Sequence, residues 1–468
     1  MQALSKLCLT PAVFAVILAL YLVGCNPPGR NTNIPQVKLS LKNTLPVKRN
    51  SVPIALSLSE LRQIAPDFSF DAYLVVSGDP PREIASQAED TNDDGQKDLL
   101  FFVVDLAAQE TKEVSVRYSP DNQMAVTLGF TRRVRAGVFP ALASVAALES
   151  REVAYLLKPS GDILPYGKSL ERLFSAESVF QGDLDFNTTP PPNWRQVFES
   201  NKISLSPNTT IEIVEREKQW KLWDGENKRQ FFIKKAEKDL EVFGEQPLLL
   251  NRFAAEPSDE LMTRLAPTDT IGSGGFRIWD TLKNEPVSIG NVRDYVQIIA
   301  DGPVRAVVRR AIPDIPLPSE EGNCSLFSKI TVSAESPWAE HQLQVKGLNE
   351  RYGIFIGLPG GDFDVDRNDR DGLLWSWSAE KGIGFGIIYP AARWVNSQDI
   401  GNAGQGVLLK PDENGMVSYH FCALWREAQL EIDTEAAFER YVEVTAKALR
   451  TPPAITMLSK PATAETKE

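Results

Sequence analysis

Only two histidines occur in the 468-residue chain, and both are candidates for proton transfer. Imidazole titrates near neutral pH, which makes it the usual acid or base in sugar ring opening, β-elimination and hydrolysis. If "PWAEHQLQVKG" forms a strand, His341 points inward on the same face as Leu343 and Val345. If "VSYHFCALW" forms a strand, Tyr419 and Phe421 lie on one face, and His420 and Cys422 lie on the other. For each histidine, the alternative is a satisfied core or surface side chain without a catalytic role.

β-Elimination from a uronate requires a base, either His or Tyr, and a cation that neutralises the carboxylate. Tyr389 is the tyrosine that we expect in this role. The stretch "GPVRAVVRRA" predicts a strand with Arg305 and Arg309 on one face and Arg310 on the other. Arg305 and Arg309 are therefore the predicted substrate-binding cations. The alternative is that these arginines are simply solvated.

Aromatic side chains gather in "LLWSWSAEKGIGFGIIYPAARW". Trp375 and Trp377 are two residues apart and share a face if this segment is a strand. Together with Trp394 they offer flat apolar platforms for the C–H faces of sugars. Arg393 can bind a carboxylate beside them. The alternative is that these aromatic side chains fill the core between two sheets.

An acidic stretch, "EDTNDDGQKD", precedes the apolar run "LLFFVVDL". Its candidate calcium ligands are Asp90, Asn92, Asp94 and Asp98. Calcium takes six to eight oxygen ligands from such compact loops, and Gly95 permits the bend. An EF-hand would need a bidentate Glu where Phe101 stands, so we expect a structural calcium that braces a hairpin. The alternative is an acidic turn. A second acidic stretch, residues 362–371, fits no single ligand spacing and predicts a solvated loop.

The N-terminal residues resemble a bacterial lipoprotein signal. Lys6 precedes the apolar run "LTPAVFAVILALYLV", which ends in "LVGC" at Leu22 to Cys25. This pattern predicts a signal peptide over residues 1–24, lipidation of Cys25, and a flexible tether over residues 25–36. The protein is then expected on a membrane of the bacterial cell envelope, held through its acyl chains. The alternative is an ordinary signal cleaved nearby.

Composition narrows the classes of partner. The formal net charge is −12, which argues against nucleic acid because phosphate binding needs a positive field. Cys324 and Cys422 would be able to pair in an oxidising envelope, but their spacing does not show whether they do. The chain lacks H-E-x-x-H, C-x-x-C, G-x-S-x-G and Walker motifs.

Period-two apolar patterns dominate the chain and predict a mainly β protein. We expect a smaller N-terminal β-unit over residues 37–130 and a large antiparallel β-sandwich over residues 131–460. That sandwich should end in a helix over residues 434–450, because one apolar stripe follows a Thr434 cap and Pro452 stops it. Residues 461–468 are expected to form a disordered tail.

Several segments are similar to the bacterial family known as domain of unknown function 4861: "SQAEDTNDDGQKDLLFFVVDLAAQE", "LEVFGEQ", "IGSGGFRIWD", "ADGPVRAVVRRA" and "FERYVEVTAKALRTPPAI". The resemblance implies a galactose-mutarotase-like β-sandwich in envelope proteins linked to the breakdown of acidic polysaccharides such as pectin. We expect a histidine ahead of "IGSGG" in this family, and "LMTRLAPTDT" has none. A catalytic role of that histidine therefore does not transfer.

Together these observations predict an envelope lipoprotein that acts on uronic-acid-containing polysaccharide or oligosaccharide, as a lyase or glycoside hydrolase. The alternative is a lipoprotein that binds such sugars without turning them over.

Overall fold

The computed structural model describes residues 34–92, 94–120, 130, 132–139, 145–168, 173, 209–214, 219–226, 228–235, 239–243, 249–254, 262–289, 294–318, 322–425 and 432–458. The predicted signal peptide, Cys25 and the predicted C-terminal tail lie outside these ranges. Among the described helices, none is both long enough and apolar enough to span a bilayer.

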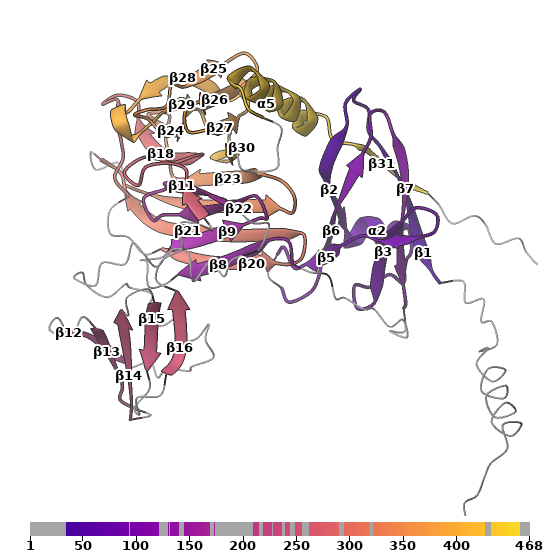
Figure 1. Ribbon diagram of the computed structural model, residues 1–468, viewed down its shortest axis with the longest axis horizontal. Helices are drawn as coiled ribbons and strands as arrows, with labels where there is room; N and C mark the ends of the chain where they lie inside the picture. The colour runs from indigo at the N-terminus through magenta and orange to yellow at the C-terminus, as the bar shows by residue number, and fades with distance from the viewer. Residues whose placement is uncertain are drawn as a thin grey trace, which may run out of the picture.

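The N-terminal domain is a sandwich of two antiparallel sheets (Figure 1). The five-stranded sheet contains, in spatial order, β31 (Ala454–Leu458), β1 (Gln36–Lys42), β7 (Thr111–Tyr118), β3 (Tyr73–Ser77) and β4 (Arg82–Glu83). The three-stranded sheet contains β2 (Arg49–Ser57), β6 (Leu99–Leu106) and β5 (Ser86–Glu89). Helix α2 (Leu58–Ile64) begins at a capping box in which the Ser57 hydroxyl and the Glu60 carboxylate each accept a backbone N–H of the other residue.

The main domain is built on an eight-stranded antiparallel sheet. Its spatial order is β20 (Tyr295–Asp301), β21 (Arg305–Pro316), β22 (Asn323–Ser333), β23 (Trp338–Lys346), β30 (Met416–Trp425), β27 (Ile383–Ile388), β26 (Leu373–Ser378) and β25 (Asp366–Asn368). In Figure 1 these strands are stacked from β20 at the lower edge of the domain to β25 at the upper edge. Successive side chains alternate between two faces, and one face is strongly apolar because it lines the main core.

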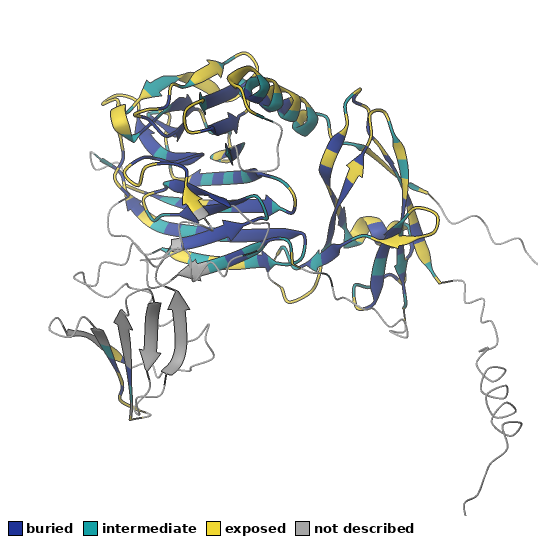
Figure 2. Ribbon diagram, in the orientation of Figure 1, coloured by how far each residue is buried: buried dark blue, intermediate teal, exposed yellow. Residues whose placement is uncertain are grey.

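Two five-stranded sheets cover that apolar face, which we call the inner face. One contains β17 (Met262–Arg264), β11 (Ile163–Lys168), β10 (Val153–Leu157), β9 (Val145–Glu149) and β8 (Arg135–Phe139). The other contains β19 (Glu285–Pro286), β18 (Gly275–Asp280), β24 (Tyr352–Leu358), β29 (Gln405–Leu409) and β28 (Trp394–Asp399). Short 3-10 helices, η5 (Ala391–Arg393) and η6 (Gly401–Ala403), flank β28. In Figure 2, many residues on the strands of these sheets are buried.

The glycine-rich segment "IGSGG" joins the two covering sheets. Gly272 forms a parallel bridge with Ile163. Its φ is +72°, and a Cβ atom would lie 1.8 Å from the Ile163 carbonyl oxygen. Only glycine satisfies both the left-handed backbone and this close approach. The segment is therefore a tight crossing between the two sheets.

A separate five-stranded meander lies between β11 and β17 in the sequence. It contains β12 (Thr210–Val214), β13 (Gln219–Asp224), β14 (Arg229–Lys235), β15 (Asp239–Phe243) and β16 (Leu249–Ala254), paired in that order. Its strands hydrogen-bond only to one another in the sheet order of the described residues. Figure 1 shows this sheet below the main domain. Its separation is a departure from the single large sandwich expected over residues 131–460.

Helix α5 (Glu435–Arg450) begins at Thr434, whose hydroxyl accepts the Ala437 N–H. Its buried residues Phe438, Val442 and Ala446 pack on the other face of the eight-stranded sheet, which we call the outer face. After α5 the chain returns to the N-terminal domain, where β31 pairs with β1. The predicted boundary at residue 460 is therefore corrected: the last strand belongs to the N-terminal domain because an unpaired edge of β1 accepts it.

The predicted fold class is confirmed: the protein is mainly β, with antiparallel sheets, a smaller N-terminal β-unit and a C-terminal helix. Cys324 and Cys422 are both buried and free. Burial raises the pKa of Cys324 to about 11 and also raises that of Cys422. Both thiols are therefore packed as small apolar side chains in this structure.

Candidate functional site

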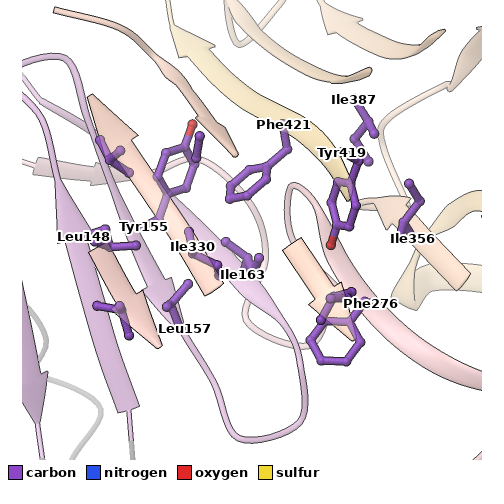
Figure 3. Packing of buried hydrophobic residues seen from close by; sticks show 14 of the residues in the cluster. Leu148, Tyr155, Leu157, Ile163, Phe276, Ile330, Ile356, Ile387, Tyr419 and Phe421 are labelled. Carbon is purple, nitrogen blue, oxygen red and sulfur yellow. The ribbon is translucent and has the colours of Figure 1, made fainter. Parts of the chain in front are cut away.

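His341 lies on the inner face and is fully buried. Its Nε2 is 2.7 Å from the Ser328 hydroxyl, and its Nδ1 is 2.7 Å from the hydroxyl of Tyr419, which donates to the Gly274 carbonyl. Burial, and then the charge of Arg310, lower its pKa to about 3. The rings of Phe276, Tyr419 and Phe421, which surround His341, are labelled in Figure 3.

This position contradicts the expectation of a catalytic His341. Both ring nitrogens have protein partners, and the side chain has no exposed surface. A cavity of about 20 Å³ lies beside His341 and Ser328, which is room for about one water molecule and not for a sugar ring. The neutral imidazole therefore holds the core together as a hydrogen-bonding group.

His420 lies on the outer face, directly opposite Glu340 in the pairing of β23 with β30. Directly paired residues place their Cβ atoms about 5 Å apart on the same face. His420 is partly exposed, and burial lowers its pKa, while the negative charge of Glu340 opposes that shift. The result at neutral pH is an uncharged imidazole beside a carboxylate. Such an imidazole can accept a proton from a substrate.

The outer face carries ordered rows of side chains, because the antiparallel register aligns every second residue across the strands. The histidine row contains Val307, Thr331, Glu340 and His420. Two residues further along the strands, the charged row contains Gln297, Arg309, Lys329, Gln342 and Ser418. The structure thus brings Arg309 and His420 to one face, and it adds the side chains of Lys329 and Glu340 between them.

Lys329 is the cation at the centre of this face. It is half-buried, and it interacts electrostatically with Glu340, Glu89 and the neighbouring arginines. Burial, and then the like charge of Arg305, lower its pKa. Gln342 donates from Nε2 to the Glu340 carboxylate at 2.7 Å. These contacts orient Glu340 and leave Lys329 in a site that favours an additional negative charge.

The N-terminal domain contributes to the same face through β5. The buried Gln87 accepts the backbone N–H groups of Val304 and Arg305 at 3.0 and 2.9 Å, and it donates to the Arg305 carbonyl at 3.0 Å. Glu89 lies 3.4 Å from the Arg305 guanidinium. Burial raises the pKa of Glu89, against the opposing effect of Arg305. Arg305 also stacks 4.8 Å above the Phe101 ring.

Arg305 is therefore placed on the predicted face but has a different role from Arg309. Its side chain is buried at the junction between the two domains and paired with Glu89. Direct contact with a substrate carboxylate is open to Arg309 and Lys329, which are only partly buried. Arg305 holds the domains together and adds positive charge behind these two groups.

The acidic loop between β5 and β6 lies next to this face, since Arg309 donates to the Thr91 carbonyl at 3.3 Å. Asp90 accepts the N–H of Gly95 at 2.7 Å, and the Asp98 carboxylate accepts the Thr91 hydroxyl at 2.8 Å. Asn92 and Asp94 also bond within the loop. These are the contacts of an acidic turn.

The described residues contain no group of three or more His, Cys, Asp or Glu side chains arranged to hold a metal ion. Asp93, in the middle of the loop, lies outside them. Asp90, Asn92 and Asp94 each accept a backbone N–H of their own loop. Calcium binding therefore remains a prediction from the sequence.

Trp375 and Trp377 share the outer face, but α5 covers them. Trp375 is buried in the cluster beneath the helix, and the Trp377 ring lies 5.6 Å from that of Phe438. The prediction that these tryptophans form a sugar platform is therefore corrected in favour of the core alternative. The sequence placed them on the right face and did not reveal that a helix would occupy it.

Tyr389 is also enclosed, in the main core cluster. Its hydroxyl donates to the Asp369 carboxylate at 3.0 Å. Burial, and then Asp369, raise its pKa above the usual tyrosine value. A phenol that is buried and harder to ionise is unsuited to be a base, so the structure contradicts the catalytic role predicted for Tyr389.

Arg393 and Trp394 lie on a different sheet, around η5 and the edge strand β28. Both are exposed. Arg393 lines an open, polar groove of about 850 Å³, together with Lys410 and loop residues near Gly347 and Gly415. The groove is formed by the end of β23, including Gln344 and Lys346, and by the turns after β23 and β29, and none of its lining residues is in the histidine row. The structure thus does not bring Arg393 and Trp394 together with His420.

The fold and the face define a large two-layer β-sandwich protein with a cationic, histidine-bearing outer sheet face. A family model described as Domain of unknown function (DUF4861) matches residues 41–138 and 265–455. The chain therefore belongs to this family. The matched segments leave out the stretch that contains the β12–β16 meander.

No curated protein matches the chain. A protein in the glycosyl hydrolase family 38 from Enterococcus faecalis has a TM-score of 0.45 and 10% identity, covering 90% of this chain and 47% of that chain. An α-mannosidase from Enterococcus faecalis V583 has a TM-score of 0.43 and 9% identity, covering 90% of this chain and 46% of that chain. The chain thus spans about half the length of these structures.

Proposed function

We propose that the protein acts on uronic-acid-containing polysaccharide in the bacterial cell envelope and cleaves it by β-elimination. The observation that supports this most is the pairing of Glu340 with His420 on a sheet face whose next row carries Arg309 and Lys329. A neutral base, a carboxylate and two accessible cations are the groups that the elimination requires.

In the proposed reaction, the substrate carboxylate lies against Arg309 and Lys329. Their charge stabilises the negative charge that develops when the proton on the adjacent ring carbon is removed. His420 accepts that proton, and Glu340 stabilises the imidazolium that forms. The bond to the neighbouring glycosidic oxygen breaks, a carbon–carbon double bond forms in the ring, and the leaving oxygen takes a proton from the imidazolium or from water.

Hydrolysis fits this face less well. Most glycosidases use two carboxyl groups on either side of the scissile bond. Glu340 offers one, whereas Glu89 is buried and paired with Arg305. Because the second carboxylate is occupied at the domain junction, the single imidazole and the cations favour elimination.

The envelope location forms part of the proposal. It is supported by the basic start, the apolar run and the "LVGC" sequence, whose last residue, Cys25, would carry the lipid. Such an anchor would hold the enzyme at a membrane surface, where long uronans or their fragments arrive.

The test is a turnover assay on a panel of polygalacturonate, rhamnogalacturonan, alginate and glucuronan, with neutral glucans for comparison. The wild-type chain is expected to release unsaturated uronate from at least one uronan. His420→Gln should reduce the rate by about 10²-fold or more, because removing a positioned base typically costs this much. The exposed Glu413→Gln, on the turn before β30, is the matched control and should leave the rate unchanged.

Absence of product from the whole panel would refute the enzymatic proposal. If the wild type then bound uronans without cleaving them, the second candidate, a non-catalytic sugar-binding lipoprotein, would stand. This candidate has its own support, because the cations of the outer face would also retain an acidic sugar without chemistry. Full activity of His420→Gln would exclude His420 as the base.

A further inference from the structure

A third row on the outer face is more exposed than the two that carry charge. It follows the charged row by two residues on each strand, and it contains Tyr295, Ala311, Phe327, Gln344 and Met416. We call it the aromatic row. Tyr295 is 56% exposed, Phe327 is 38% exposed and Met416 is 39% exposed. Large apolar side chains aligned at the surface of a sheet indicate a binding surface.

Exposure falls steadily across the outer face. The aromatic row is the most open, the members of the charged row other than Gln297 are half-buried, and in the histidine row Val307 is fully buried and Thr331 is 8% exposed. Beyond that row, the N-terminal domain covers Arg305 on one side and α5 covers Trp375 on the other. The face therefore runs from an open aromatic edge to an end flanked by the N-terminal domain and α5, where His420 and Glu340 remain partly exposed.

We propose that the aromatic row is a sugar-stacking subsite that holds an acidic oligosaccharide while its reacting unit lies at His420. This inference rests on the proposed function, and it identifies where the remainder of the substrate binds. The rings of Tyr295 and Phe327 supply flat surfaces for the C–H faces of sugar rings. The cations of the charged row, one step away, supply the complementary charge for the carboxylates.

Charge complementarity selects an acidic occupant. Arg309 and Lys329 lie on one side of the aromatic row, and the Lys346 ammonium lies 5.2 Å above the Phe327 ring on the other. A neutral glucan would gain the stacking but not the ion pairs. An apolar protein surface would have to bury these cations without partners, which is costly.

The distances select an oligomer over a single sugar. Phe327 lies two strands from His420, which is about 10 Å, and four residues further along the strand direction, which is about 13 Å. One ring cannot span this separation. A chain of several uronate units can contact the aromatic row, the charged row and His420 together.

The test measures binding of a galacturonate oligomer by calorimetry in the His420→Gln background, where the ligand survives. Tyr295→Ala and Phe327→Ala should each weaken binding by about tenfold, as expected for the loss of one aromatic contact. Trp223→Ala, which removes an exposed aromatic side chain from the β12–β16 meander, is the matched control and should bind normally. Because both test residues are exposed, the melting temperatures should agree with that of the parent.

Normal binding by both Tyr295→Ala and Phe327→Ala would overturn this inference, even if wild-type turnover were found. Weakened binding by these variants supports it, even if no turnover were found and the protein only captured sugars. The same titration with monomeric galacturonate should show no difference between Tyr295→Ala and its parent. A tenfold loss with the monomer would contradict the oligomer requirement.

Discussion

His341 and His420 come from the same pair of strands and face opposite ways. His341 is opposite Tyr419, and Glu340 is opposite His420. A one-residue difference in phase therefore sends one imidazole into the core and the other to the outer face. As a consequence, His341 stabilises the packing between the layers, and His420 remains accessible on the outer face.

The two imidazoles should titrate differently, and selective labelling of histidine makes both visible by NMR. The pKa of His341 is lowered to about 3 by burial, so its signal should stay neutral through mildly acidic pH. His420 should titrate below the usual histidine value of about 6.5. Glu340→Gln should move the His420 titration to still lower pH, because the carboxylate favours the charged form.

An upward shift in Glu340→Gln, or no shift, would contradict the pairing of Glu340 with His420. The two signals can be assigned with His420→Gln, which removes one of them. His341 also has a stability consequence, because its folded pKa lies below its unfolded value. Its contribution to the free energy of unfolding is present above about pH 6.5 and is lost as the pH falls toward 3.

Much of the residue placement follows from strand alternation alone. The structure confirms that His341 points inward and that His420 points outward. It also confirms that Arg305 and Arg309 share a face. Lys329 and Glu340 were missed as site residues, although the same period-two pattern puts them on the outer face. What alternation does not provide is which strands become neighbours, and therefore which side chains align into rows.

At the scale of elements, β5 joins the two domains through Glu89, which pairs with Arg305, and through Gln87. Gln87 satisfies three backbone groups at the start of β21 with one side-chain amide. Because these groups are buried, removing the amide leaves donors without partners.

Gln87→Ala should therefore lower the free energy of unfolding by about 1–3 kcal/mol. It should also weaken turnover, since Arg305 and the charged row lose their support. Chemical denaturation monitored by tryptophan fluorescence gives the first quantity. Gln96→Ala, in the exposed part of the same hairpin, is the control and should change stability by less than about 0.5 kcal/mol. Equal stabilities of the two variants would show that the junction does not depend on Gln87.

Helix α5 illustrates why the tryptophan platform was predicted incorrectly. Its apolar stripe and its Thr434 cap were recognisable in the sequence, and its observed bounds, Glu435–Arg450, agree closely with the prediction. The surface that this stripe covers depends on tertiary packing. Trp375 and Trp377 supply that surface, so the strongest aromatic signal in the sequence is a helix-packing site.

At the scale of the whole molecule, the β12–β16 meander is an addition to a self-sufficient sandwich. β11 and β17, which flank it in sequence, are adjacent antiparallel strands in which Lys168 pairs with Met262. The family model leaves out residues 139–264, a stretch that contains the meander together with β9, β10, β11 and β17. A short turn can therefore join the two strands in place of the insertion.

Replacing residues 173–258 by a short Gly-Ser linker should preserve the sandwich and its outer face. We expect a free energy of unfolding within about 1 kcal/mol of the parent and unchanged turnover on short oligomers. Calorimetry and the uronan assay check these two points. Unfolding of the shortened chain, while the full chain remains folded, would show that the meander is an integral part of the sandwich.

The sequence pattern does not predict which strands pair with one another across the whole molecule. β31 follows Pro452 and Pro453, yet it pairs with β1 at the other end of the chain. This return ties α5 to the N-terminal domain, and Arg49 reinforces it by donating to the carbonyls of Thr451 and Ala448. Such long-range pairing leaves no local signal, because any edge strand with period-two alternation would serve equally well.

A crystal structure of His420→Gln bound to a galacturonate oligomer would show directly whether the outer face is the substrate site. We expect sugar rings against Tyr295 and Phe327, a carboxylate paired with Arg309 or Lys329, and a glycosidic bond beside residue 420 and Glu340. An oligomer bound around Arg393 or on the β12–β16 meander, without contact to Tyr295, Phe327 or residue 420, would contradict the proposed site.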